Sequence, residues 1–214
     1  MDGRPIRQLK RGDEMELRIL DLEATELRVE GDEQRKITGY AAVYNRKSEN
    51  LGGFVEIIRS GAFRKIVESA DVRALFNHDP NFVLGRTASN TLKIEENQKG
   101  LKFEITPPDT QIIRDLVMSP IERGDVSGCS FSFNVAKDGE KWSEQGDMYL
   151  REITEVSALG DVGPVTFPAY PATSVNVRST KEVLDSHVSA LRAHEQELEI
   201  AKSRARRKRK VQSL

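Results

Sequence analysis

One stretch, residues 124–135, constrains the fold more than any other part of the 214-residue chain. Two sets of side chains alternate along it: Phe131, Phe133 and Val135, and between them Ser130, Ser132 and Asn134. Successive side chains of a strand point to opposite faces, so each set shares one face. The pattern predicts a strand that buries its phenylalanines and carries hydroxyls on the other face. Taken alone, it fits an ordinary structural strand as well as a functional one.

Short strand-like segments fill most of the first 170 residues. They are rich in β-branched and aromatic residues and are separated by turn residues. We expect strands within residues 15–20, 25–29, 36–44, 54–58, 71–78, 84–87, 91–94, 100–105, 148–156 and 162–167. Such a series is typical of antiparallel strands that meander and close on themselves, so the expected class is a strand-rich α+β fold.

Two helices are expected inside this region. Ser60 is a suitable N-cap for a helix over residues 61–70, and Asp109 for a second helix interrupted near Pro120. In the second helix, we expect four residues to share the buried face: Ile112, Ile113, Leu116 and Val117.

A third helix is expected near the C-terminus. Ser179 and Glu182 form a capping box, and the helical pattern continues to about Ser203. Leucines recur on it at seven-residue spacing, at Leu184, Leu191 and Leu198. We therefore divide the chain into a flexible N-terminus (1–14), a body (15–177), and a C-terminal helix with a basic tail (178–214).

Composition limits the environment and the partners. No run of 18 apolar residues occurs, and the N-terminus lacks a signal-peptide pattern, so we expect a cytosolic protein without a membrane partner. A single cysteine, Cys129, excludes an internal disulfide, and with three histidines a zinc site is hard to assemble. Residues 201–214 hold seven basic and no acidic residues, whereas the rest of the chain has a net charge of −8. The tail is thus expected to contact an acidic protein surface or nucleic acid.

The three histidines are the candidates for a general base. His187 and His194 interleave with the leucines of the C-terminal helix, which indicates helix-surface or seam positions. His78 ends an apolar strand just before Asp79-Pro80, where an imidazole can project into a cleft and accept a hydroxyl proton. A turn histidine or a buried core histidine is the alternative interpretation.

A serine–histidine pair usually needs an acid that orients the ring. Asp161 follows Gly160 near the start of a late strand, where small neighbours allow close packing. An ordinary turn aspartate is the alternative, and Glu155 is the competing carboxylate. On these grounds alone, Ser130 and Ser132 remain equally suitable as nucleophiles.

Seven segments together resemble the prohead protease family of tailed bacteriophages, serine peptidases related in fold to the herpesvirus assemblins. They are residues 39–44, 60–63, 75–79, 84–86, 100–103, 124–133 and 162–171, and they follow the family's order and spacing between about residues 36 and 177.

The resemblance implies a catalytic set. It makes His78 the base and Ser130 the nucleophile, with Asp161 in the place of the acidic third member. Ser132 stands where the family often has glycine, and aspartate replaces the more common glutamate. Arg86 is a further candidate for shaping the site.

The resemblance also implies a fold and a function. The fold is a closed antiparallel β-barrel flanked by helices. The function is to act inside the procapsid, in the host cytoplasm, and to cut the scaffolding segment from the major capsid protein and then the protease itself. A homodimer is an implied partner state, and no cofactor is needed. The alternative is a non-catalytic assembly protein that keeps this fold. For the C-terminal helix and tail, we expect a role in bringing the chain into the assembling shell.

Overall fold

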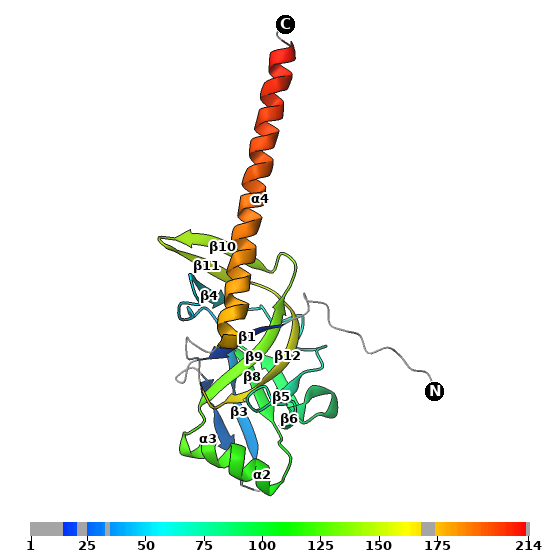
Figure 1. Cartoon of the computed structure of the whole chain (residues 1–214). Coiled ribbons are helices and arrows are strands. Elements are labelled where there is room, and N and C mark those ends of the chain that lie inside the picture. The colour runs from blue at the N-terminus through cyan, green and yellow to red at the C-terminus, as the bar shows by residue number, and fades with distance from the viewer. Residues whose placement is uncertain (1–14, 21–24, 33–34, 168–173, 213–214) are drawn as a thin grey trace, which may run out of the picture.

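The computed structural model describes residues 15–20, 25–32, 35–167 and 174–212, and its strands form three sheets (Figure 1). The five-stranded sheet has the order β1 (Glu16–Leu20), β9 (Gly128–Val135), β12 (Val156–Val165), β5 (Arg73–Leu75) and β6 (Val83–Arg86). The four-stranded sheet has the order β2 (Arg28–Glu30), β3 (Lys36–Val43), β8 (Gly100–Ile105) and β7 (Leu92–Glu96). The third sheet has the order β10 (Glu140–Gln145), β11 (Met148–Ile153) and β4 (Phe54–Ile58). The expected strand-rich α+β class is confirmed.

The strand pairing differs from the expected purely antiparallel arrangement. The pairs β4–β11 and β5–β12 are parallel, while the other pairings between these strands are antiparallel. The parallel partners are joined by long connections, and only a tight turn forces neighbouring strands to be antiparallel. Closure of the strands into a barrel stays a prediction, and the expected flexible segment 1–14 lies outside the described residues.

The core forms where β9 packs its aromatic face inward, as its alternation predicts. Phe131 and Phe133 stack with ring centroids 4.9 Å apart, and Phe63 meets Phe131 edge-on at 5.8 Å. All three side chains are fully buried. The opposite face of β9 is thereby left to its serines.

The segment 61–70, expected to be a helix, forms a series of turns instead. Gly61 has a φ of +90°, which is incompatible with a right-handed helical turn at that position. The carbonyl of Phe63 accepts hydrogen bonds from both Ile66 N–H and Val67 N–H, so no regular ladder forms. The apolar side chains still pack against the core, which explains why their spacing resembles that of a helix.

The second helical region forms, but its start and its buried face differ from expectation. It consists of α2 (Gln111–Ile113), the π-helical η2 (Arg114–Met118) and α3 (Ser119–Arg123). Thr110, rather than Asp109, is the N-cap, with its hydroxyl accepting the Ile113 N–H. Ile113 and Val117 are buried as expected.

Two apolar residues of this region are exposed against expectation. Ile112 has 56% and Leu116 has 49% of its surface accessible. One helix side packs on the body, and neighbouring positions such as 112 and 113 lie about 100° apart around a helix, so they do not share its buried face.

The C-terminal helix α4 (Ser174–Gln212) is longer than expected. It begins five residues before the predicted capping box at Ser179, so it crosses the expected boundary at residue 178. It also continues past Ser203. No glycine or proline occurs between residues 174 and 212, so nothing in the sequence interrupts the helix.

The first part of α4 packs against the body, and the rest extends away from it (Figure 1). His187 stacks on Trp142 with ring centroids 4.4 Å apart and meets Tyr149 edge-on at 5.4 Å. A β-carbon on Gly53 would lie only 2.9 Å from the Leu184 side chain. Burial lowers the pKa of His187, so the stack favours the neutral imidazole. Residues 189–202 are exposed.

A buried cluster of charges joins β1 to the three-stranded sheet. Arg18 and Arg151 each bond to the same oxygen of Glu56, at 2.8 and 2.9 Å. Arg151 also bonds to Glu16 at 2.6 Å and to Glu140 at 2.6 Å. Burial alone would raise the pKa of Glu16, but the hydrogen bond from Arg151 and the nearby charges outweigh it and hold that pKa below its usual range.

Replacing Arg151 with alanine should lower the free energy of unfolding by about 3–5 kcal/mol, because buried carboxylates lose their partner. Urea unfolding measures this change. The control is Arg28→Ala, which breaks the exposed pair with Glu30 and should cost no more than about 1 kcal/mol. Equal losses in the two variants would contradict a stabilising role for the cluster.

Candidate active site

His78 lies in a tight turn at the end of β5. The Asp79 N–H donates to the Phe76 carbonyl at 3.0 Å, and the two central residues, Asn77 and His78, have φ values of +53° and +57°. This is the backbone of a hairpin turn that favours asparagine first and glycine second. Histidine in the glycine position carries strain of about 1–3 kcal/mol, and such strain is concentrated at functional sites.

Asp161 holds the ring of His78 from β12. One oxygen of the buried Asp161 carboxylate accepts a hydrogen bond from Nδ1 of His78. The parallel pairing of β5 with β12, in which Asp161 lies opposite Arg73, brings the turn close to this carboxylate. Nε2 of His78 is buried and has no hydrogen-bond partner among the described residues. With the proton on Nδ1, Nε2 carries the lone pair that a general base needs.

Ser132 is bonded to the same carboxylate. It lies opposite Asp161 in the β9–β12 register, donates to the second carboxylate oxygen, and accepts the Asp161 backbone N–H at 3.0 Å. A register shift between Leu159 and Asp161 accompanies this arrangement. Gly160 lies in the shifted segment, where a β-carbon would be only 2.8 Å from the Ser132 hydroxyl. The Ser132 hydroxyl is therefore engaged both as donor and as acceptor.

Ser130 differs from Ser132 in its contacts. It lies two residues earlier on the same strand, so it shares the face of Ser132, and it is 1% exposed. Its partner across β12 is Gly163. Within the described part of the chain, we find no hydrogen bond to the Ser130 hydroxyl, from His78 or from any other residue.

The other sequence candidates lie apart from this arrangement. Glu155 forms an ion pair with Lys65, and Arg86 makes a bidentate contact with Asp71, at 2.6 and 2.7 Å. His187 takes part in the α4 contact described above, and His194 is exposed, in agreement with their prediction as helix-surface or seam residues.

Cys129, next to Ser130, is unsuited to act as a nucleophile. Its side chain is fully buried, and this burial raises the pKa of the thiol well above its ordinary value. The thiolate is the reactive form of cysteine, so the side chain remains inert in this environment.

The features that sequence reasoning missed are the contacts of Asn77 and the close approach at Gly163. A β-carbon at Gly163 would lie 2.0 Å from the carbonyl oxygen of Leu75, so glycine is required for β5 to approach β12. Only the glycine itself, in a strand-like stretch, was a sequence signal for such an approach.

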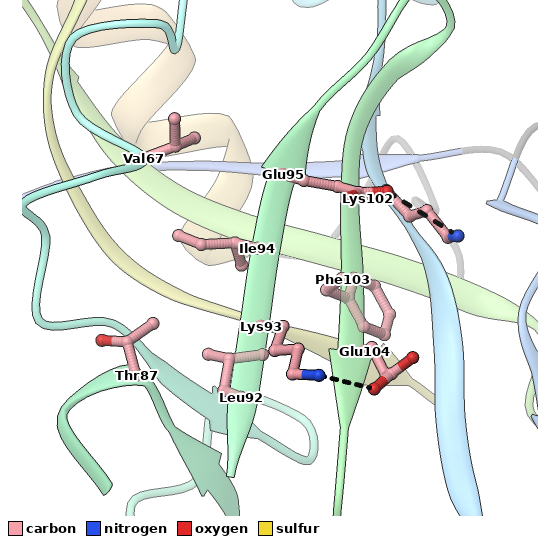
Figure 2. Close-up of a pocket in the computed structure, with 9 residues that line it drawn as sticks. All are labelled: Val67, Thr87, Leu92, Lys93, Ile94, Glu95, Lys102, Phe103 and Glu104. Carbon is pink, nitrogen blue, oxygen red and sulfur yellow. Dashed lines mark ion pairs between the residues drawn. The ribbon is translucent and has the colours of Figure 1, made fainter. Parts of the chain in front are cut away.

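A separate hollow of about 530 Å³ lies beside strands β7 and β8 (Figure 2). Residues that line it include Leu92, Ile94 and Phe103, together with charged side chains of the same two strands. The lining contains neither His78 nor Asp161, nor the serines of β9. Among the described residues, there is no cluster suited to hold a metal ion and no helix long and apolar enough to cross a membrane.

Among the described residues, a histidine held by a buried carboxylate lies near a strand whose Ser130 hydroxyl has no other hydrogen bond, an arrangement compatible with the serine hydrolase class. Comparison with protein families gives the narrower assignment: residues 20–186 match the family described as caudovirus prohead serine protease. The match covers most of the chain, so the chain belongs to this family of serine peptidases, and the resemblance seen in the sequence is confirmed. No curated protein and no solved structure gives a significant match.

Proposed function

We propose that Ser130, His78 and Asp161 form the catalytic triad of an endopeptidase that removes the scaffolding segment of the major capsid protein during capsid maturation. The observation that carries this proposal is the hydrogen bond between His78 Nδ1 and the buried Asp161 carboxylate, beside the hydroxyl face of β9. Membership of the prohead serine protease family supports the substrate class.

In the proposed mechanism, the Ser130 oxygen attacks the scissile carbonyl carbon while Nε2 of His78 accepts the hydroxyl proton. Asp161 keeps the ring oriented and stabilises the imidazolium that forms. Backbone N–H groups stabilise the oxyanion. His78 then gives the proton to the leaving amine, and water hydrolyses the acyl-enzyme in the same way. No cofactor takes part.

Two observations favour Ser130 over Ser132 as the nucleophile. The Ser132 hydroxyl is held by the carboxylate and the backbone N–H of Asp161, so attack from it requires breaking both contacts. The Ser130 hydroxyl has no such competing bonds in the described part of the chain. Its contact with Nε2 of His78 would form when substrate binds, because catalytic hydrogen bonds often tighten only in the complex.

Further parts of the proposal rest on the family resemblance. They are self-cleavage, action within the procapsid in the host cytoplasm, closure of the strands into a barrel, and a homodimer as the active state.

Ser130→Ala and His78→Ala should each lower cleavage by about 10⁶-fold, because triad members act as a unit. We expect Ser132→Ala to retain measurable cleavage, since it loses a support of Asp161 rather than the nucleophile. Co-expression with the cognate capsid protein, followed by mass spectrometry of the capsid subunit, measures the processing. Full processing by Ser130→Ala would reject Ser130 as nucleophile, and an unprocessed subunit with the wild-type chain would support the non-catalytic alternative.

We further propose that the distal part of α4 and the basic tail bring the protease into the assembling shell. Leu191 and Leu198, which are seven residues apart and so share one face of the helix, are 39% and 45% exposed beyond the body. The seven basic residues from Lys202 to Lys210 follow directly. An apolar stripe next to a cationic segment suits a helical partner with an acidic surface.

Removal of residues 195–214 should leave peptide cleavage unchanged and lower the amount of protease in purified procapsids several-fold. The cut lies beyond His187, so the contacts of α4 with Trp142 and Gly53 are kept. Quantitative mass spectrometry of procapsids measures incorporation. A matched full-length variant with the seven basic residues changed to glutamine separates the contribution of the charge to incorporation from the contribution of the apolar stripe. Undiminished incorporation of the truncated chain would rule out this role.

A further inference from the structure

Asn77 ties the turn that carries His78 to the strand that carries Asp161. Its backbone N–H donates to the Pro164 carbonyl at 3.1 Å. Its side-chain oxygen accepts the Thr166 N–H at 2.8 Å, and its side-chain amide donates to the Thr166 hydroxyl at 3.0 Å. The backbone N–H, the side-chain oxygen and the side-chain amide of one asparagine thus all bond to residues at the end of β12.

The contacts of Asn77 and the His78–Asp161 hydrogen bond together link the turn and β12 into a closed loop. Asn77 precedes His78 directly, and Pro164 and Thr166 follow Asp161 by only three and five residues. The turn is therefore fixed to β12 at two places, by Asn77 on one side and by the His78–Asp161 hydrogen bond on the other. Displacement of the turn from β12 would break both.

The backbone of the turn makes this second attachment necessary. Histidine at a φ of +57° is strained, so relaxation of His78 to an ordinary backbone conformation would lower the free energy of the turn. The hydrogen bonds of Asn77 oppose that relaxation. Because Asn77 is exposed, each bond contributes little to global stability, and its effect is on the placement of the ring.

We propose that Asn77, through Thr166, is a positioning residue that keeps the His78 ring on Asp161 with Nε2 aimed at the reacting serine. This inference rests on the proposed function of the site. The loss of Asn77 should lower kcat by about 100-fold, the effect of a displacement of roughly 1 Å in a catalytic group. KM should change little, because Asn77 supports the base and is not assigned a contact with substrate.

The test uses Asn77→Gly, because glycine accepts the positive φ and removes only the side-chain bonds. Thr166→Ser is the matched control, because it keeps both the hydroxyl and the backbone N–H that bond to Asn77. Thr166→Val removes the hydroxyl acceptor alone. Steady-state kinetics uses a synthetic peptide that spans the cut site mapped in co-expression. We expect a low kcat for Asn77→Gly, an intermediate kcat for Thr166→Val and a wild-type value for Thr166→Ser.

A second readout does not depend on activity. In the Ser130→Ala chain, the proton between His78 Nδ1 and the Asp161 carboxylate should give a low-field NMR resonance, assigned by its loss on His78→Gln. Adding Asn77→Gly should remove or broaden this resonance, and adding Thr166→Ser should leave it intact. A resonance lost on Asn77→Gly supports the positioning role even when the wild-type chain cuts no peptide, so the two proposals fail separately.

Three outcomes would overturn the inference. The first is a Ser130→Ala chain that shows no such resonance. The second is an Asn77→Gly substitution that leaves both the resonance and kcat unchanged. The third is an Asn77→Gly substitution that lowers the melting temperature and leaves kcat unchanged. The last result would show a purely structural role.

Discussion

The antiparallel pairing of β9 with β12 is the constraint on which the rest of the site depends. Its register sets Ser132 opposite Asp161 and Ser130 opposite Gly163, so hydroxyls and carboxylate meet on one face while the phenylalanines of β9 fill the core. The parallel strand β5 then delivers His78 to the carboxylate. Gly163 allows this approach because any β-carbon there would collide with the backbone of β5.

The carboxylate of Asp161 distinguishes the two serines, because only Ser132 bonds to it in the described part of the chain. Asp161 accepts hydrogen bonds from Ser132 and from His78, one on each oxygen, which fixes the carboxylate as well as the ring. A buried carboxylate is stable only when such donors satisfy it. In the proposed mechanism, Ser132 therefore supports the acid, and the substitution of serine for the family's frequent glycine adds a hydrogen bond rather than a competing nucleophile.

The sequence predicted the parts that depend on local periodicity. Alternation predicted the two faces of β9, and Asp79-Pro80 predicted a turn after His78, although His78 itself lies in a turn beyond β5 rather than at the end of the strand expected over residues 71–78. It could not distinguish Ser130 from Ser132, because the difference lies in a cross-strand register. The helix predicted over residues 61–70 was wrong because turns that bury Phe63 produce the same spacing. The contacts of Asn77 join segments 89 residues apart and leave no local pattern.

The central claim is that Ser130, and not Ser132, is the nucleophile activated by His78. A fluorophosphonate, which phosphonylates activated serines, tests it most directly when the labelled peptide is sequenced by mass spectrometry. The account predicts one label on Ser130, strongly reduced labelling in His78→Ala, and labelling that persists in Ser132→Ala. A label on Ser132, or equal labelling of Ser130 in the presence and absence of His78, would contradict it.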